Sequence, residues 1–338
     1  MVKNTATIKD IAERANVSVA TVSRYLNSTG YVDASTAKNI AAIIDKLDYR
    51  PNRMAQSLKT KESKNIVLVV PDIQNPFYSR MANEVQHLAF SQGYTITLFD
   101  SEENYENEKI YIKLTSDIGA DGIIFASASK HQTILDELDK IRIPAVVVNS
   151  YDVCKYDSVH GIRGLSTYLT TKHLIELGHR KIGFAGGDPV TVIKASRKAG
   201  FIKAMNEFEV PIKEEYIFMM GLSSDSGKKA GTYFSALHDR PTAICCANDL
   251  IALGMYQAFF QYGIKIPEDV SITGMDNIMY GDLCNPRLTT VTNDSCEFAK
   301  KSVEALMQRI RKEYEGEPRE FLINRELIIR ESTKSVKG

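Results

Sequence analysis

The sequence predicts a small all-α head that contains a helix-turn-helix, followed by an α/β body of two similar lobes, each built on a doubly wound parallel sheet. Three observations predict this fold class. Three short helical periodicities follow one another in residues 7–47. From residue 65 onward, short β-branched runs alternate with amphipathic helical stretches, which is typical of parallel sheets covered by helices. The alternation occurs in two rounds, one on either side of residue 160, and 338 residues are enough for several domains.

Charge is divided unevenly along the chain. The 42 basic and 42 acidic side chains cancel overall. Residues 1–64, however, contain 11 Lys/Arg and 6 Asp/Glu, for a net charge of +5, and the remainder contains 31 and 36, for a net charge of −5. A basic head on an acidic body can meet phosphates at one end only.

The head is predicted to hold three helices. The first begins in TIKDIAERA, where Thr7 and Asp10 have the spacing of a capping box and apolar residues recur at helical intervals. The pattern stops at Asn16, after which Ser18 can cap a second helix. A third amphipathic helix is predicted over Ala34–Leu47. Two short helices joined by a tight turn, with a third helix after them, describe a helix-turn-helix domain.

The exposed face of the second predicted helix carries small side chains and one guanidinium, in Val19, Ala20, Thr21, Ser23 and Arg24. Such a face can enter a major groove between the phosphates, where Arg24 can bond a guanine with both arms. Helical hairpins are common, so the periodicity alone also fits a domain that binds no DNA. The composition of this face is what favours DNA binding.

The segments TIKDIAERANVSVATVSRYLN and LDYRPNRMAQSL resemble the DNA-binding head and hinge of the LacI/GalR family of bacterial regulators. The resemblance implies that Val19 and Ala20 set sequence specificity and that Arg24 makes a shared base contact. It also implies a hinge helix in residues 52–58 that folds only on the operator, with Leu58 wedged into a central C-G step. From the helix face and the resemblance together, the residues predicted to contact DNA are Thr7, Val19, Ala20, Thr21, Ser23, Arg24, Asn27, Asn52, Ala55 and Leu58.

The predicted domains are residues 1–51 for the helix-turn-helix head, 52–64 for the hinge and 65–338 for the effector-binding and dimerisation body. In the hinge stretch NRMAQSLKTKESK, Met54 and Leu58 are the only large apolar residues. Such a segment cannot bury enough surface to offset the entropy of ordering it, so we expect it to fold on DNA.

Replacing Leu58 with alanine is expected to leave the fold intact and to weaken operator binding sharply, because the wedge that stabilises a bent, unstacked base step is lost. Operator affinity measured at fixed salt checks this. An unchanged affinity would contradict the wedge.

Polar and aromatic side chains follow the predicted strands of the body. The strand-length runs are NIVLVVP, YTITLFD, DGIIFAS and PAVVVNS before residue 160, and KIGFAGG, YIFMMG, TAICCAND and VSITGMD after it. Ligands of doubly wound sheets bind beyond the carboxyl ends of the strands. Carboxylates, amides and rings at those ends suit polyhydroxylated ligands, although Asp249 and Asn277 are better interpreted as caps of the helices that follow. The candidates are residues 72–77, Asp100, Ser101, Asn149, Asp188, Asn248, Asp249, Asp276 and Asn277.

The resemblance to the LacI/GalR family extends over the body, through stretches such as PDIQNPF, HLIELGHRKIG, SRKAGF, ANDLIALG and ELIIREST. It implies a body like that of periplasmic sugar-binding proteins, with an effector cleft between the lobes. The residues that it implies as effector contacts are Ile73, Asn75, Phe77, Asn149, Arg197, Asn248 and Asp276.

One stretch departs from the family pattern. Where many members read V-x-x-D-N-x-x-G, this chain has SVHGIRG, with His160 and Gly161 in place of the acid and the amide. A cation near the cleft, from His160, Arg163 or Lys194, would suit a sugar acid or a sugar phosphate. Solvated surface is the plainer interpretation of each of these three side chains.

The sequence contains none of the common enzymatic signatures. It has no GxxxxGK[ST], no strand-borne GxGxxG, no GxSxG and no HExxH, and its six histidines lack metal-ligand spacing. The five cysteines form no CxxC pair, which is typical of a reducing cytoplasm. We therefore expect no enzyme, metal or cofactor, and a cytoplasmic protein without a membrane partner. A transport-type binding protein, the other rival, is disfavoured by the basic head and by the absence of a signal peptide.

The expected function follows from the head, the body and the resemblance. One recognition helix reads few bases, so we expect a homodimer on a palindromic operator. The resemblance implies a repressor of carbohydrate-use genes. It is expected to leave its operator when a sugar, sugar acid or sugar phosphate binds between the lobes, since induction is the commoner sign in the family. Corepression is the alternative that the sequence leaves open.

Overall fold

The computed structural model describes residues 6–27, 29–49, 62–126, 131–149, 155–188 and 192–336. The chain divides into two compact units, residues 1–63 and 64–338, and each is described by itself. Within the described ranges, no helix is long and apolar enough to cross a membrane.

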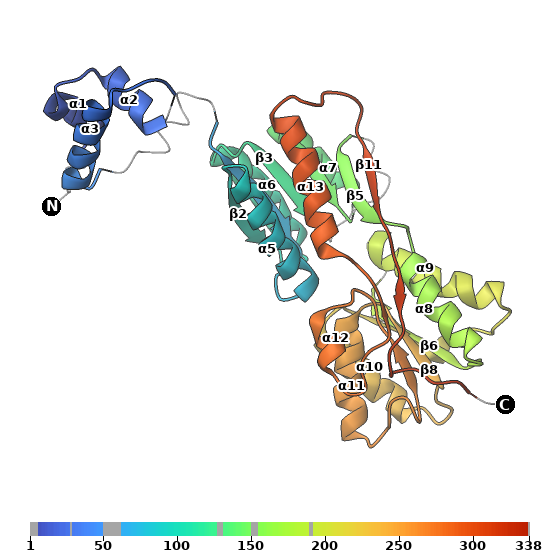
Figure 1. Cartoon of the computed structure of the whole chain (residues 1–338). Helices are drawn as coiled ribbons and strands as arrows, with labels where there is room; N and C mark the ends of the chain where they lie inside the picture. The colour runs from blue at the N-terminus through green and yellow to red at the C-terminus, as the bar shows by residue number, and fades with distance from the viewer. Residues whose placement is uncertain are drawn as a thin grey trace. The chain divides into compact units, whose positions relative to one another are not determined.

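The first unit is the predicted three-helix head, made of α1 (Ile8–Ala15), α2 (Val19–Asn27) and α3 (Ala34–Leu47) (Figure 1). The capping box of α1 forms: the Thr7 hydroxyl accepts from the backbone N–H of Asp10, and the Asp10 carboxylate accepts from the Thr7 N–H. The helices meet over a small core in which Ile11, Val22 and Ile40 are fully buried. A domain this small depends on such caps as well as on its core.

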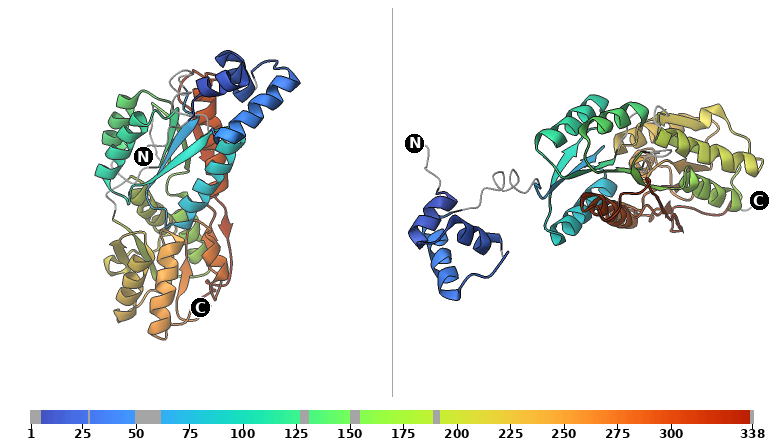
Figure 2. Two further views of the ribbon diagram at one scale, coloured as in Figure 1. Left: turned by 90° about the vertical axis from the view of Figure 1, so that its left-hand side faces the viewer. Right: turned by 90° about the horizontal axis from the view of Figure 1, so that it is seen from above.

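The second unit contains two lobes, and lobe 1 is built on a six-stranded sheet in the order β11-β5-β4-β3-β1-β2 (Figure 1). All of its strand pairs are parallel. Its helices α5 and α13 pack against each other on one face, as Figure 2 also shows, and α6 and α7 pack together on the other. The bounds are β1 (Asn65–Val70), β2 (Thr95–Asp100), β3 (Gly122–Ala126), β4 (Ala145–Val148), β5 (Asp157–Gly161), β11 (Glu320–Ile323), α5 (Pro76–Ser91), α6 (Tyr105–Asp117), α7 (His131–Ile141) and α13 (Ser295–Ile310).

Alternate residues of β1 supply the two cores of lobe 1. Ile66, Leu68 and Val70 belong to the core on the side of α5 and α13, and Val67 and Val69 to the core on the side of α6 and α7. Because both faces are covered, the strand reads as a continuous apolar run rather than as an alternating one.

Lobe 2 is built on a four-stranded parallel sheet in the order β7-β6-β8-β9. Helices α8 and α9 pack together, and α10 packs closely on α11. The bounds are β6 (Ile182–Gly187), β7 (Ile217–Met220), β8 (Ala243–Cys246), β9 (Ser271–Thr273), α8 (Leu165–Glu176), α9 (Val192–Glu207), η1 (Glu214–Tyr216), α10 (Ser224–Ala236), α11 (Asp249–Gln261) and α12 (Met279–Leu283).

The lobes are not two successive halves of the chain. After β5 the chain passes from lobe 1 to lobe 2, and residues 292–294 bring it back so that α13 and β11 complete lobe 1. A third crossing follows β11, and β12 (Leu327–Ile328) then pairs with β10 (Thr290–Val291). Every predicted strand forms, but β5, β10, β11 and β12 were not predicted, because these strands are short or polar.

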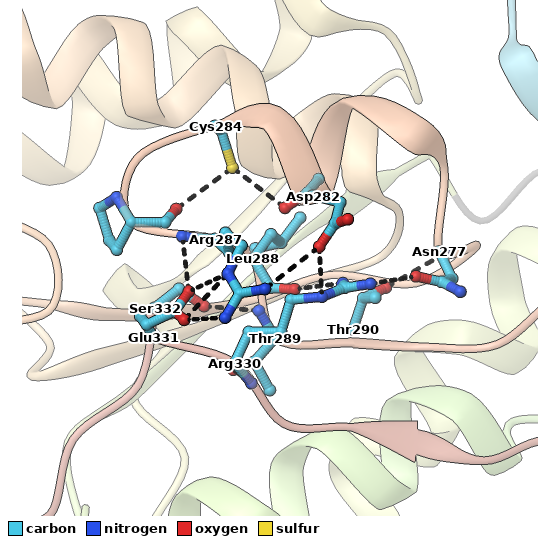
Figure 3. A network of polar contacts seen from close by, with 12 residues as sticks. Asn277, Asp282, Cys284, Arg287, Leu288, Thr289, Thr290, Arg330, Glu331 and Ser332 are labelled. Atoms are coloured by element: carbon cyan, nitrogen blue, oxygen red, sulfur yellow. Dashed lines mark hydrogen bonds and ion pairs between the residues drawn. The ribbon is translucent and has the colours of Figure 1, made fainter.

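The last crossing is tied to lobe 2 by arginines (Figure 3). Arg287 donates from Nε to both carboxylate oxygens of Glu331 at 2.9 Å. Arg330 donates to the carbonyl oxygen of Leu288 and to Oδ1 of Asn277, each at 2.8 Å, and lies 3.3 Å from the Asp282 carboxylate. All of these bonds stay within lobe 2.

A buried ion cluster fastens the returning C-terminal part of the chain to β5. The Asp157 carboxylate is fully buried and accepts from Arg309 and from Arg319, with shortest contacts of 2.8 Å to each guanidinium. Both guanidiniums lie over the ring of Tyr314. Burial raises the pKa of Asp157, but the hydrogen bonds from the two arginines outweigh burial and hold that pKa below its usual value.

Replacing Asp157 with asparagine is expected to lower the free energy of unfolding by about 3–5 kcal/mol, because it leaves buried guanidinium charge without its counterion. Urea denaturation at neutral pH measures this. The matched control is Asp139→Asn, which breaks an exposed pair with Lys155 and should cost less than about 1 kcal/mol.

A group whose folded pKa is lowered stabilises the fold above its unfolded pKa, and that contribution is lost as the pH falls through the folded pKa. The difference between wild type and Asp157→Asn should therefore shrink below about pH 4. Equal stability at neutral pH would contradict the role of Asp157.

Candidate functional site

The start of α2 carries an exposed face of the predicted kind. Val19 is 41% exposed, and Ala20 and Arg24 are exposed beside it. Ser18 accepts from the backbone N–H of Thr21, as expected for a cap of α2. Small side chains at this end of the helix leave its backbone free to approach a groove closely.

The remaining predicted DNA contacts of the head surround this face or lie beyond the described part of the chain. Asn27 is exposed and donates from Nδ2 to the carbonyl oxygen of Ser23 at 2.9 Å, which ties these two polar side chains together. The Thr7 hydroxyl is engaged with Asp10. Asn52, Ala55 and Leu58, the predicted hinge contacts, lie outside the described residues.

A polar cavity of about 500 Å³ lies between the two lobes of the body. Lobe 1 supplies the segments that follow β1, β2 and β4, and lobe 2 supplies α9 and the segments that follow β7, β8 and β9. The cavity therefore lies at the carboxyl ends of both sheets, where doubly wound folds bind ligands. Its lining residues are Pro71, Asp72, Gln74, Asn75, Phe77, Tyr78, Asp100, Glu102, Glu103, Asn149, Lys194, Arg197, Gly221, Leu222, Ser223, Asn248, Asp276 and Asn293.

Arg197 and Asp276 bring opposite charges to one wall of the cavity. Arg197 donates to the carbonyl oxygen of Ala247 at 3.0 Å, and its Nε is buried without a hydrogen-bond partner among the described residues. Asp276 accepts from Nδ2 of Asn293 at 2.8 Å. Burial raises the pKa of Asp276, and the nearby positive charge of Arg197 opposes that rise. A guanidinium and a carboxylate that line one cavity offer a ligand both hydrogen-bond donors and acceptors.

The backbone of Asp276 is held in a rarely populated conformation, with φ of 110°. A non-glycine residue in this region costs about 1–3 kcal/mol and persists where neighbours over-determine it. Here the Asp276 N–H donates to the carbonyl oxygen of Val291 at 3.0 Å. The strained residue lines the cavity, which supports a functional role for it.

Tyr78 lines the cavity although it was not predicted. Burial raises the pKa of its phenol, against which the charge of Arg197 and a hydrogen bond with Asn149 act in the opposite direction. The hydroxyl therefore stays protonated and can donate. Its signal was present in the sequence, since Tyr78 directly follows the predicted contact Phe77.

The other predicted effector contacts are placed unequally. Asn149 and Asn75 line the cavity, and Asn75 also caps α5 by accepting from the Phe77 N–H at 3.0 Å. Phe77 reaches the wall but is 4% exposed and packs against Phe298. Ile73 is not among the lining residues, and its side chain packs on the core of lobe 1.

Asn248, and not Asp249, caps α11. The Asn248 side chain accepts from the Ile251 N–H at 2.9 Å and donates to the carbonyl oxygen of Leu222 at 2.8 Å, so it fixes part of the cavity wall. Asp249 is fully buried, accepts from Thr290 at 2.6 Å, and does not line the cavity. Burial raises its pKa well above the usual value.

The predicted cap at Asn277 is also wrong. Ile278 occupies the position before α12, and Asn277 accepts from Arg330 instead. Asp249 supports this loop by accepting from the Ile278 N–H at 2.9 Å. Both capping predictions failed because the path of the backbone after the strand decides which residue precedes the first turn of the helix. The residue type alone does not reveal that position.

The cations proposed for an acidic effector do not gather at the cavity. His160 is buried on β5, with Nε2 2.7 Å from the Glu320 carboxylate, and neither His160 nor Arg163 is a lining residue. Lys194 lines the cavity but pairs across it with Glu103 at 2.7 Å.

Carboxylates outnumber cations on the cavity wall. Burial raises the pKa of Asp72, and the negative charges of Asp100 and Glu103 raise it further. Charged carboxylates in such number repel an anion. The expectation of an acidic effector therefore has no support in the geometry. The acidic lining residues are Asp72, Asp100, Glu102, Glu103 and Asp276, and the basic ones are Lys194 and Arg197.

No group of three or more His, Cys, Asp or Glu side chains suited to a metal ion occurs within the ranges that the structure covers.

Comparisons with known proteins identify both parts of the chain. Residues 7–52 match the family described as bacterial regulatory proteins, lacI family, and residues 171–333 match a periplasmic binding protein-like domain. The HTH-type transcriptional repressor PurR of Photobacterium profundum is 34% identical over 333 residues, covering 98% of this chain and 99% of the relative.

Two solved structures extend the comparison. The lac repressor dimer bound to operator and the anti-inducer ONPF matches with a TM-score of 0.88 at 25% identity, over 98% of this chain and 100% of that one. A LacI family regulator from Enterococcus faecium with bound ribose matches with a TM-score of 0.71 at 26% identity, over 81% of this chain and 100% of that one. These relatives are transcription regulators and not enzymes.

Proposed function

The chain belongs to the LacI family of bacterial regulatory proteins and is a DNA-binding transcriptional repressor, and we propose that it controls carbohydrate-use genes from a palindromic operator. A neutral sugar would bind between the lobes and release the repressor. The observation that carries this proposal is the cavity itself, because one ligand there contacts residues of both lobes.

The chemistry of the lining supports a neutral polyhydroxylated ligand. Its carboxylates and amides accept hydrogen bonds from hydroxyl groups, and Arg197 and Tyr78 donate to ring or hydroxyl oxygens. An anionic ligand would face the surplus of carboxylates. The Enterococcus faecium regulator solved with ribose supports the same class.

A flat nitrogen heterocycle is the alternative, since the rings of Phe77 and Tyr78 line the cavity beside the acidic groups. Its ring N–H groups would donate to the carboxylates. This class differs from a sugar in having few hydroxyl groups, so the two are separable by a binding screen.

Thermal shift of the full chain tests the ligand class. Neutral aldoses, the matching sugar acids, the matching sugar phosphates and a set of purine bases are compared at one concentration. We expect the largest stabilisation from a neutral sugar. A larger shift with the acids or phosphates would overturn the neutral class, and a larger shift with the bases would favour the heterocycle.

DNA reading is assigned to the exposed face of α2. Arg24 would bond a guanine, and Val19 and Ala20, which offer no side-chain hydrogen bonds, would meet thymine methyls and read shape. The backbone contacts proposed for Thr7, Ser23 and Asn27 would set the register. Such a regulator works where the DNA is, so we place it in the cytoplasm.

A homodimer is proposed to read the two half-sites, in line with the lac repressor dimer on its operator. The body has an exposed apolar surface on α12, where Met279 is 62% and Leu283 72% exposed. Exposed apolar side chains in one short helix suit an interface between identical chains.

Replacing Leu283 with aspartate is expected to shift the repressor from dimer to monomer, because a carboxylate would be buried without a partner. Sedimentation equilibrium measures the mass. The control is Ile212→Asp, at an apolar residue that is 38% exposed on another part of lobe 2. A dimer that persists in Leu283→Asp would exclude this surface as the interface.

A further inference from the structure

Arg325 lies in the third crossing between the lobes and reaches the second. It follows β11, and its guanidinium donates to the carbonyl oxygen of Thr292 at 3.2 Å and to Oδ1 of Asn293. The guanidinium also lies 5.6 Å from the ring centre of Phe298, the buried residue that begins the apolar side of α13. One side chain thus joins two segments that run between the lobes.

The same guanidinium rests on the first crossing. Gly161 is the last residue of β5, where the chain leaves lobe 1. A Cβ added to Gly161 would lie 2.3 Å from Nε and 2.7 Å from Cζ of Arg325. A side chain at position 161 would therefore displace the guanidinium from its place.

The second crossing connects Arg325 to the ligand cavity. Asn293 accepts from Arg325 through Oδ1 and donates through Nδ2 to Asp276 at 2.8 Å. Asp276 and Asn293 both line the cavity, and burial raises the pKa of Asp276 while the nearby charge of Arg197 opposes that rise. A continuous path of polar contacts therefore runs from the cavity wall to the place where the chain crosses between lobes.

We propose that Arg325 is a positioning residue that clamps the three crossing segments in one arrangement of the lobes, and that Asn293 and Asp276 link this arrangement to the contents of the cavity. The link to regulation rests on the proposed function of the cavity. The clamp itself does not rest on that function, because it concerns the arrangement of the lobes in the absence of ligand.

The arrangement suits a switch better than a static support. The crossings run between the β5–β11 pair of lobe 1 and the β10–β12 pair of lobe 2. The short stretches between these two pairs can shift by small backbone rotations, as in hinge closure. Because the guanidinium group is planar and rigid, its hydrogen bonds can form in only a few arrangements of these segments. A ligand that draws Asp276 toward itself would move Asn293 and so change which arrangement the fork can hold.

The distance between the lobes tests the clamp. Spin labels are placed at exposed positions of the full chain, on Lys113 in α6 of lobe 1 and Asn206 in α9 of lobe 2. Unnatural amino acids carry the labels so that the five native cysteines are retained. Labelled chain is diluted with unlabelled chain, and pulsed electron paramagnetic resonance reports the interlobe distance distribution without ligand.

Two variants remove the clamp in different ways. Arg325→Met deletes the charge and the fork, and Gly161→Ala keeps Arg325 but displaces its guanidinium. Both are expected to broaden the distance distribution by roughly two-fold, because an unclamped hinge samples further arrangements. Arg325→Lys keeps the charge without the fork and should also broaden it.

The control is Arg330→Met, which removes an arginine whose bonds stay within lobe 2. It should lower the melting temperature and leave the interlobe distribution unchanged. An unchanged distribution in both Arg325→Met and Gly161→Ala, with folded protein by circular dichroism, overturns the clamp.

The link to the cavity has its own readout. As a single variant, Asp276→Ala should broaden the interlobe distance distribution. The double variant of Asp276→Ala and Arg325→Met should give a distribution no broader than that of Arg325→Met, as expected of residues in one network. Additive broadening would overturn the link. These outcomes need no ligand, so they are distinguishable from a failure of the proposed sugar site.

Discussion

Replacing Arg24 with methionine is expected to reduce the discrimination between the operator and unrelated DNA. Arg24 is exposed on α2, beside the small residues Val19 and Ala20 that allow the helix to approach the bases. A bidentate arginine–guanine pair contributes about 1–3 kcal/mol of discrimination, or roughly five- to 150-fold in affinity ratio. Methionine keeps the length of the side chain and removes the fork. Fluorescence anisotropy on operator and scrambled duplexes at one salt concentration gives the ratio.

The control for Arg24 is Arg14→Met on α1, an exposed arginine of the same domain. Loss of one general phosphate contact lowers affinity for both duplexes alike and reduces the salt dependence. Arg14→Met should therefore leave the ratio unchanged. If Arg24→Met also weakens both duplexes equally, Arg24 contacts phosphate and not a base.

Replacing Arg197 with methionine is expected to abolish the response to ligand while operator binding in its absence is retained. The Arg197 side chain lines the cavity, and its guanidinium is anchored to the carbonyl oxygen of Ala247. Truncating one partner of a buried, charge-assisted contact costs about 2–5 kcal/mol, or roughly 30- to several-thousand-fold in ligand affinity. Isothermal titration with the sugar that gives the largest thermal shift measures the loss.

The control for Arg197 is Lys198→Met, the next residue of α9, which does not line the cavity. It removes the same charge from the same helix and should leave ligand affinity within about two-fold, as surface charges usually do. Retained ligand affinity in Arg197→Met would remove this residue from the site.

The head could be predicted almost entirely from the sequence because its signals are local. The capping box of Thr7 and Asp10 and the helix Ala34–Leu47 are confirmed as predicted. Helix caps and helical periodicity act within a few residues, so no distant part of the chain is needed to recognise them.

The fold class of the body could be predicted from the sequence, but the pairing and connection of all its strands could not. The buried runs that form β1 and β8 predict parallel strands, because they have the length of strands and an apolar composition. The pairing of β5 with β11 joins His160 to Glu320, which are 160 residues apart. β5 is largely polar, and β11 has only four residues, so neither has a long apolar run to mark it. Pairing over that separation depends on the whole fold of lobe 1.

The lining of the cavity could likewise be predicted only in part. Asn149 and Asp276 could be predicted because strand ends of doubly wound sheets meet the ligand. The pairing of Lys194 with Glu103 could not, because the two residues come from opposite lobes and meet only when the cavity is assembled. That pairing is one reason why we propose a neutral ligand over a sugar acid or a sugar phosphate.

Operator affinity with and without sugar is the measurement that tests the central claim most directly. The full-length repressor is titrated onto its own palindromic operator by fluorescence anisotropy, with the sugar identified by thermal shift absent or saturating. We predict that the sugar weakens binding by about 1–3 kcal/mol, or roughly five- to 150-fold, and that Arg197→Met shows no such change. Equal operator affinity with and without a sugar that demonstrably occupies the cavity would contradict the claim.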